Sequence, residues 1–173
     1  NSNSAEADFI LAELRRMIDE GTLQSVGVIT PFREQQEALS RLLFNDSYAD
    51  RFQSHLRLKI MTFDSCQGEE RDLIIYSMVA NHAHDGLNYI FPTSLEDQRE
   101  RIEEALKVQR LNVGFSRAKE GMLFVLSKPI GEFKGSAGRA IRHFHSILDR
   151  RSTPTGGPTE SPMEDKVLQW VQQ

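Results

Sequence analysis

Two short segments carry residue types that suit phosphate chemistry. Gln67 and Gly68 lie in a polar turn after a strand-like segment. A glycine there lets the main chain approach a phosphate closely, and a free main-chain amide can donate to it. Arg117 carries a rigid fork of donors that stays protonated, which suits the negative charge that grows during phosphoryl transfer. The alternative interpretation is an ordinary turn glycine beside a solvated Glu70.

Several common catalytic motifs do not occur in the 173 residues. The sequence has no G-x-x-x-x-G-K-[ST], and therefore no phosphate-binding loop of that type. Residues 131–138 are rich in glycine but fit neither this loop nor the dinucleotide fingerprint, so we interpret them as a loop before a helix. Neither a G-x-S-x-G elbow nor an H-E-x-x-H pair is present.

Histidines and the single cysteine could suggest other sites. Residues 82–85 contain two histidines and an aspartate, and His143 and His145 form a second pair. Without supporting cysteines or a fixed ligand frame, solvated histidines are the better interpretation, and we expect no metal site in this chain. For Cys66, a small buried thiol is a better interpretation than a nucleophile.

Length and composition indicate an ordinary globular domain. The chain has 173 residues, 39% of them hydrophobic, with 21 Lys and Arg against 25 Asp and Glu, so the formal charge is −4. No apolar run approaches the roughly 18 residues that a membrane helix needs, so we expect no membrane contact. One cysteine excludes an internal disulfide, which favours a reducing, cytoplasmic location.

The N-terminal part reads as helix, strand, helix. Asn3 or Ser4 can cap a first helix that Gly21 ends, with apolar residues at helical spacing. Residues 26–29 form an apolar run typical of a buried strand. Thr30 is a suitable N-cap, and the proline after it suits the first position of a second helix.

The rest of the chain alternates in the same way. We expect strands at 58–63, 73–79 and 122–126, a loop at 80–93 and a helix at 137–150. A capping box at 94–97 predicts a helix over 95–109. We expect residues 110–120 to be helical at least in part, with Gly121 ending that helix. Strands that alternate with helices predict an α/β domain with a mainly parallel sheet.

Composition divides the chain into a domain and a tail. Residues 1–150 form the expected domain, and residues 151–162 are a linker rich in proline, glycine and threonine. Residues 163–173 begin a further helix that is cut short, so we expect the chain to be part of a longer protein.

Three segments resemble motifs of the superfamily 1 helicases. Val26–Gln35 looks like motif IV, Met61–Ile75 like motif V and Arg110–Lys119 like motif VI. Together they resemble the second RecA-like domain of these helicases, in the branch that includes the nonsense-mediated-decay RNA helicase and the DNA replication helicase–nucleases. The resemblance covers about residues 1–130 and implies a RecA-like fold without a P-loop of its own.

The resemblance also implies roles for single residues. Arg117 matches the arginine finger of motif VI, Gly68 would lie near the γ-phosphate, and Glu70 would meet the ribose. If residues 110–119 are helical, Arg110 shares a face with Arg117. Arg110 would then either support the same anion or bind a neighbouring carboxylate.

Motifs IV and V match the family less fully. Gln35 matches a recurring position of motif IV, but Gln36 stands where some relatives have a phosphate-binding arginine, and Arg33 could substitute for it. Cys66 replaces the usual aromatic residue of motif V. Thr62 matches a threonine that contacts the nucleic-acid phosphate in relatives, although threonine is also simply a good strand former.

By this resemblance, ATP and Mg²⁺ bind in a cleft between two lobes. The first lobe, the N-terminal RecA-like domain of the same protein, would carry the P-loop and hold most of the metal. This chain would be the second lobe of an ATP-dependent helicase on single-stranded nucleic acid, with DNA favoured over RNA. Alone, it should not hydrolyse ATP appreciably.

Other interpretations remain open at this stage. The chain could be a catalytically silent RecA-like binding module, or part of a translocase that does not separate strands. Residues 161–168 also resemble the opening helix of restriction-type nuclease domains that follow such helicases in some bacterial proteins. A solvated helix is the alternative for this tail.

Overall fold

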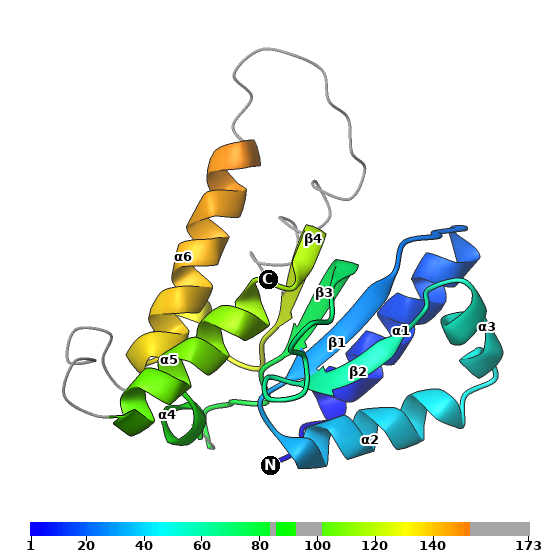
Figure 1. Ribbon diagram of the computed structural model, residues 1–173. Helices are drawn as coiled ribbons and strands as arrows, with labels where there is room; N and C mark the ends of the chain where they lie inside the picture. Colours follow the sequence, from blue (N-terminus) through cyan, green and yellow to red (C-terminus); the bar gives the residue numbers. More distant parts are fainter. Residues whose placement is uncertain (84–85, 93–101, 153–173) are drawn as a thin grey trace.

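Figure 1 shows the computed structural model, which describes residues 1–83, 86–92 and 102–152. Its centre is a four-stranded sheet in which neighbouring strands are parallel, in the order β2-β1-β3-β4. The strands are β1 (Val26–Thr30), β2 (Lys59–Thr62), β3 (Arg71–Ser77) and β4 (Ala118–Val125). The predicted α/β class is confirmed, and the arrangement is consistent with a RecA-like fold.

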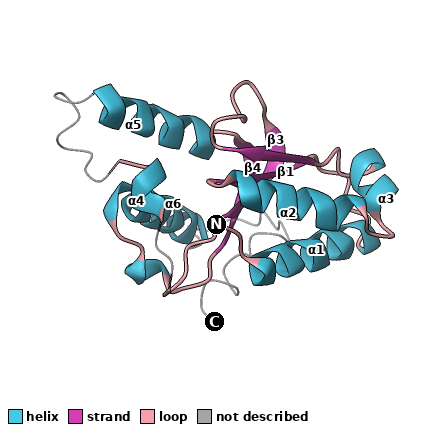
Figure 2. Cartoon of the chain, turned by 90° about the horizontal axis from the view of Figure 1, so that it is seen from below, coloured by secondary structure: helices cyan, strands magenta, loops and turns pink. Residues whose placement is uncertain are grey.

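Three helices cover one face of the sheet (Figure 2). They are α1 (Ser4–Asp19), α2 (Arg33–Phe44) and α3 (Ala49–Ser54). Leu14 of α1 and Leu39 of α2 are buried against Val28 and Ile75 of the central strands. Because β1 and β3 are covered on both faces, their sequences read as nearly continuous apolar runs.

The remaining helices lie on the opposite face, next to β3 and β4 (Figure 2). They are α4 (Leu87–Ile90), α5 (Ile102–Phe115), the short 3-10 helix η1 (Ile130–Glu132) and α6 (Gly135–Ser152). Aromatic side chains dominate the core of this layer. Five of them form a chain of ring contacts: Phe63, Tyr76, Phe91, Phe115 and Phe124. This aromatic layer places motif V against motif VI.

Local sequence determines where the first helix begins and ends. The Asn3 side chain accepts from the main-chain nitrogen of Glu6, as an N-cap does. At the other end, Gly21 has a φ of +75°, in the left-handed region that glycine adopts without strain. Both predicted signals are confirmed.

The second helix begins later than predicted. Thr30 does not cap it, because Thr30 is the last residue of β1 and is paired with Thr62 of β2. Helix α2 begins at Arg33, and Phe32 holds the N-cap position without a side-chain hydrogen bond. Strand pairing extends β1 by one residue, to Thr30, and the helix begins two residues later than the proline signal predicts.

The expected helix within residues 110–120 is confirmed for 110–115, but its expected end at Gly121 was wrong. Helix α5 ends at Phe115, and β4 begins at Ala118, which pairs with Arg71 of β3. Gly121 therefore lies inside a strand. Arg117 lies in the two-residue connection between helix and strand, so it does not share a helix face with Arg110.

Two short helices were not predicted, and some predictions lie outside the described residues. Helix α3 is one, and α4 lies inside the segment expected to be a loop. The capping box at 94–97, most of the linker and the tail at 163–173 fall outside the described ranges. Within those ranges, none of the helices combines the length and the apolar character that crossing a bilayer requires.

Candidate functional site

The motif V turn, residues 66–69, is built around a glycine. The main-chain nitrogen of Glu69 donates to the carbonyl oxygen of Cys66 over 3.1 Å, and Gly68 has a φ of +79°. A positive φ at the third position is what a type II turn requires. A β-carbon built on Gly68 would meet no atom within 4 Å. Glycine is therefore favoured at this position by the positive φ and not by a lack of space. The space beside Gly68 is open to a ligand.

Arg117 follows helix α5 and folds back onto its last turn. The Arg117 Nε donates to the carbonyl oxygen of Val113 over 2.8 Å, and the side chain is half-buried. Within the described ranges, no group accepts from its two terminal nitrogens. One edge of the guanidinium is thus fixed by the protein, while the remaining donors can meet an anion.

The guanidinium of Arg117 lies close enough to motif V to affect it electrostatically. Burial raises the pKa of the Cys66 thiol, and the Arg117 charge opposes this rise. Burial likewise raises the pKa of Tyr76, again with Arg117 acting in the opposite direction. Cys66 is fully buried, and its Sγ donates to the carbonyl oxygen of Phe63 over 3.3 Å. The small buried thiol predicted for Cys66 is confirmed.

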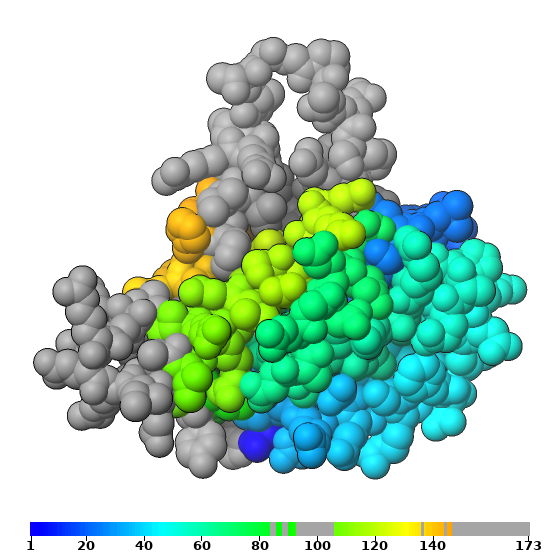
Figure 3. Space-filling view, viewed as in Figure 1, coloured from blue at the N-terminus to red at the C-terminus, as the bar shows by residue number. Residues whose placement is uncertain are grey.

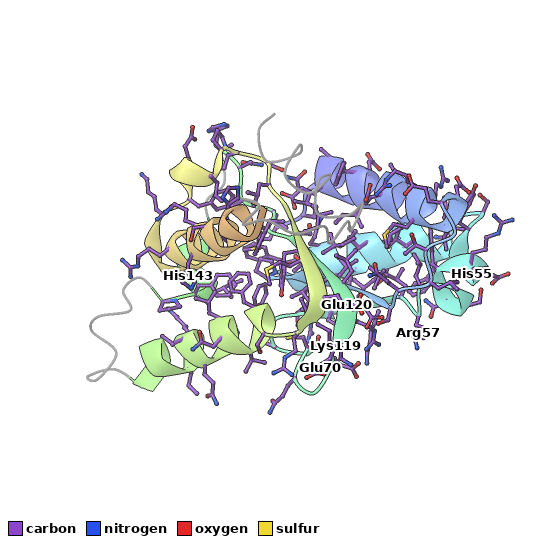
Figure 4. All side chains as sticks on the ribbon, turned by 90° about the horizontal axis from the view of Figure 1, so that it is seen from above. His55, Arg57, Glu70, Lys119, Glu120 and His143 are labelled. Atoms are coloured by element: carbon purple, nitrogen blue, oxygen red, sulfur yellow. The ribbon has the colours of Figure 1, made fainter. Side chains whose placement is uncertain are left out.

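Hydrogen bonds join motifs V and VI at the start of β3 and β4. The main-chain nitrogen of Arg71 donates to the carbonyl oxygen of Arg117 over 3.2 Å. The Glu70 carboxylate lies 3.6 Å from the Lys119 ammonium, and Figure 4 shows the two side chains near one another. In Figure 3 the green surface of motif V continues into the yellow-green surface of motif VI. The two motifs form one surface of the domain.

The acidic residues after Gly68 differ in their surroundings. Glu69 lies 2.6 Å from Lys59, whose ammonium holds the pKa of that carboxyl below its usual range. Glu70 is exposed, with a lysine at 3.6 Å as its charged neighbour. Its carboxylate oxygens therefore keep acceptor capacity for hydroxyl groups such as those of a sugar.

Arg110 binds a carboxylate of its own domain. Its Nε donates to the Asp64 carboxylate, and its Nη1 donates to the carbonyl oxygen of Ile90 over 3.0 Å. Of the two roles expected from the sequence, the structure shows the contact with a neighbouring carboxylate. Arg110 thereby ties α5 to the loop that begins motif V.

Gln35 is fully buried and its amide is engaged within the domain. The amide oxygen accepts from the main-chain nitrogen of Asn3 over 2.8 Å. The amide nitrogen donates to the Asn3 carbonyl oxygen over 3.1 Å and to the Ser77 hydroxyl over 2.9 Å. These bonds use the whole amide, so the structure does not present Gln35 to a ligand.

Arg33 follows the carboxyl end of β1, and Thr62 is the last residue of β2. Gly68 and Arg117, in contrast, precede the amino ends of β3 and β4. Arg33 is exposed, and among the described residues it makes no ion pair or side-chain hydrogen bond. The Thr62 hydroxyl lies 3.1 Å from the Ser65 hydroxyl and accepts from the Ser65 main-chain nitrogen. The structure thus does not bring Arg33 to Arg117.

Comparison with known proteins now identifies the family. A family model described as "AAA domain" matches residues 1–129. The chain belongs to this AAA-domain family. Helicase sen1 of Schizosaccharomyces pombe is 32% identical over 112 residues, which is 65% of this chain and 6% of that protein. The regulator of nonsense transcripts 1 homolog of Arabidopsis thaliana is 29% identical over 128 residues, which is 73% of this chain and 9% of that protein.

A third relative is the ATP-dependent helicase upf1 of S. pombe, which is 27% identical over 106 residues, or 61% of this chain. The AAA domain spans a tenth or less of the length of each of these three relatives. The recognition made from motifs IV, V and VI is confirmed: the chain is a superfamily 1 helicase-family region.

The residues of the AAA domain fit a nucleotide better than they fit a metal ion. The Gly68 turn is open, and Arg117 retains unused cationic donors, which together suit phosphate oxygens. The described residues hold no group of three histidine, cysteine or acidic side chains that could bind a metal ion. Of the histidine clusters considered in the sequence, His84 and Asp85 lie outside the described residues.

A buried acid in the AAA domain was missed by the sequence analysis. Glu6 is 2% exposed, and its carboxylate accepts from the Ser77 hydroxyl over 2.7 Å, the Ser127 hydroxyl over 2.8 Å and the Val79 main-chain nitrogen over 2.9 Å. Val79 has a φ of +67°, which is strained for a β-branched residue. We call the following set the polar network: Asn3, Glu6, Gln35, Ser77 and Ser127.

Burial dominates the electrostatics of the polar network. It raises the pKa of Glu6 above its ordinary value, although the hydrogen bonds from Ser77, Val79 and Ser127 act in the opposite direction. In the sequence, Glu6 looks like an ordinary acidic residue of a first helical turn. Its partners are more than 70 residues away in the chain, so no local signal could have found them.

Proposed function

We propose that this AAA domain is the second motor lobe of an ATP-dependent superfamily 1 helicase or translocase. The observation that carries the proposal is the placement of Arg117 beside the motif V turn, with its Nε anchored on Val113 and its terminal nitrogens unused in the described part of the chain. Two of the three relatives are named as helicases, and one of these as an ATP-dependent helicase, which supports the same activity in the whole protein.

In this proposal the lobe contributes charge and shape to one side of an ATP site. Bound ATP with Mg²⁺ supplies the phosphoryl group that is transferred to water. Arg117 holds its terminal N–H groups toward the γ-phosphate oxygens, where negative charge grows in the transition state. The exposed backbone at Gly68 approaches the phosphate without a side chain in the way.

Glu70 would orient the nucleotide from the same surface. Its exposed carboxylate lies two residues after Gly68 and is paired only at 3.6 Å with Lys119, so it can accept from ribose hydroxyls. Arg110 and Gln35 contribute differently in this proposal. Arg110 fixes α5 through Asp64, and Gln35 fixes α2 through Ser77, so both support the site without contacting the nucleotide.

The other half of the site would come from a first RecA-like lobe. A P-loop lysine and an acidic metal ligand are needed for hydrolysis, and the 173 residues contain no P-loop motif. The 173-residue chain by itself should therefore not hydrolyse ATP appreciably. Opening and closing of the two lobes would couple hydrolysis to movement along a strand.

We place single-stranded nucleic acid at the other end of motif V. Thr62 ends β2, and its hydroxyl lies at a half-buried position beside Ser65, where a phosphate oxygen could replace the partner hydroxyl. The segment from Thr62 to Glu70 then touches nucleic acid at its start and nucleotide at its end. We favour DNA over RNA as the substrate.

The test uses the full-length protein. ATP hydrolysis is measured alone and with single-stranded DNA or RNA, and strand displacement is measured on a partial duplex. The proposal expects hydrolysis that single strands stimulate. No hydrolysis under any condition would instead indicate a silent binding module, and stimulated hydrolysis without displacement would indicate a translocase. Stronger stimulation by RNA than by DNA would overturn the preference for DNA.

A further inference from the structure

Phe63 of motif V and Gly114 of motif VI pack against one another without room for a side chain on the glycine. A β-carbon built on Gly114 would lie 2.1 Å from Cδ1 and 2.3 Å from Cε1 of Phe63, far inside van der Waals contact. Gly114 is helical, so the close approach of the ring, rather than an unusual φ, is what excludes a larger residue.

The ring of Phe63 is buried among three other aromatic rings. Phe63 is 2% exposed. Its ring centroid lies 4.8 Å from that of Phe91 and 5.4 Å from that of Phe115, both in edge-to-face contact, and 6.1 Å from that of Tyr76. The Phe63 main-chain nitrogen also donates to the Thr30 carbonyl oxygen over 3.2 Å, which ties the residue to the sheet.

The turn of α5 that receives this ring is the turn that holds Arg117. The carbonyl oxygen of Val113 accepts from the Arg117 Nε, and the carbonyl oxygen of Gly114 accepts from the Tyr76 hydroxyl over 2.9 Å. A shift of residues 113–114 would therefore move the acceptor that fixes the guanidinium. Phe63 sets how closely this turn can approach the sheet.

We propose that Phe63 and Gly114 are positioning residues for Arg117. The inference rests on the proposed function, because it assigns the pair a role in the phosphoryl transfer that Arg117 would assist. Neither residue touches the nucleotide. The Phe63 ring is held between the sheet and three aromatic side chains, and it sets the distance between the sheet and the last turn of α5. Gly114 allows the turn to come that close, because it has no side chain to meet the ring.

The experiment measures kcat and KM for ATP of the full-length protein with saturating single-stranded DNA, and compares four variants. Gly114→Ala adds the methyl group that the ring excludes. Phe63→Val combined with Gly114→Ala makes room for it, and Phe63→Val alone is the reference for the pair. Phe52→Leu is the control, since Phe52 is 1% exposed in the other core cluster, which contains neither Phe63 nor Gly114.

We expect Gly114→Ala to lower kcat by about 10- to 100-fold while KM for ATP changes by less than about twofold, because a misplacement of about 1 Å can cost that much in rate. The double variant should recover to within about threefold of Phe63→Val. Phe52→Leu should lower the melting temperature but leave kcat within about twofold of the wild type.

Three results would overturn the inference: a normal kcat for Gly114→Ala, a double variant no faster than Gly114→Ala, or an equal loss of kcat in Phe52→Leu. Failure of both Gly114→Ala and the double variant to fold would also count against it, because the contact would then serve stability alone. Arg117→Ala separates the two proposals. If that variant keeps its kcat, the proposed function fails; if it loses kcat while Gly114→Ala does not, only the present inference fails.

Discussion

The main-chain nitrogen of Arg71 lies 3.2 Å from the carbonyl oxygen of Arg117, and this hydrogen bond joins motif V to motif VI where β3 and β4 begin. The bond continues into the ladder of the two strands, since Arg71 also pairs with Ala118. The residues proposed to meet the nucleotide, Gly68, Glu70 and Arg117, all lie within a few residues of this junction. Sheet pairing therefore determines how the two motifs are placed relative to one another.

Gly68 is predicted to matter for both stability and activity. Gly68 has a φ of +79°, which strains any residue with a β-carbon. Gly68→Ala should therefore lower the free energy of unfolding by about 1 kcal/mol. Gly21→Ala is a matched control, because Gly21 has a φ of +75° and the same open surroundings, and it lies at the end of α1, outside the three motifs. Both variants should lose similar stability in urea titrations. Only Gly68→Ala should also slow ATP hydrolysis by the full-length protein, and an equal slowing in both would contradict its role.

Gln35 is predicted to act through stability. Gln35→Ala removes the three hydrogen bonds of a buried side-chain amide, and leaves polar atoms of Ser77 and Asn3 without this partner. The free energy of unfolding should therefore fall by about 2–3 kcal/mol. Gln36→Ala is the neighbouring control, since half-buried Gln36 makes one bond, to the Ile60 carbonyl oxygen, and should cost about 1 kcal/mol or less. Chemical denaturation measures both. A raised KM for ATP in Gln35→Ala without loss of stability would instead indicate a nucleotide contact.

Arg110 is predicted to be a structural tie. Arg110→Ala loses the Asp64 contact and the bond to the Ile90 carbonyl oxygen, and should lower the free energy of unfolding by about 1–2 kcal/mol. Asp64→Ala should cost less than about 1 kcal/mol, because its carboxylate is largely exposed and its ion pair is screened by water. The prediction fails if Arg110→Ala unfolds like the wild type while its KM for ATP rises.

Glu6 should give the domain a specific dependence on pH. Burial raises its folded-state pKa above the unfolded value, so the folded state binds the proton more tightly than the unfolded state. The contribution of Glu6 to stability is therefore full below the ordinary carboxyl pKa of about 4.3, and it is lost as pH rises through the folded-state value. Glu6→Gln cannot titrate and should not show this loss.

The measurement compares urea midpoints of wild type and Glu6→Gln from pH 4 to pH 8, beginning near the ordinary carboxyl pKa and extending above it. The difference in unfolding free energy, wild type minus variant, should fall as pH rises. A glutamine at position 6 can keep these hydrogen-bond contacts: its amide oxygen can accept from the Val79 main-chain nitrogen, and its amide nitrogen can donate to the Ser127 hydroxyl oxygen. A difference that stays constant, or that grows with pH, would show that burial does not raise the pKa of Glu6.

The alternation of strands and helices was predictable because it depends on local apolar runs. The run at 26–29 and the run at 73–76 are buried on both faces of the sheet, and such strands read directly from sequence. The caps of α1 were equally local, since Asn3 and Gly21 act on the adjacent turn. The motif positions of Gly68 and Arg117 followed from the resemblance to motifs V and VI of the superfamily 1 helicases.

What was missed depends on partners distant in sequence. Residues 116–120 contain good helix formers, but β4 begins at Ala118 because β3 offers a free edge. Gln35 looks like a surface residue of a helix, yet Asn3 and Ser77 bury it. From the sequence, Gly114 is only a glycine that lowers helix propensity. The structure shows that the Phe63 ring packs against it and leaves no room for a side chain. Tertiary contacts decided each of these positions.

The central claim is that Arg117 stabilises phosphoryl transfer, and the ATP hydrolysis rate of the full-length Arg117→Ala variant tests it most directly. We predict a fall in kcat of about 10³-fold or more at saturating ATP and single-stranded nucleic acid, with Arg117→Lys recovering only a small part because it lacks the guanidinium fork. Arg41→Ala, on the exposed side of α2, is the control and should hydrolyse ATP normally. A kcat of Arg117→Ala within about twofold of the wild type would contradict the claim.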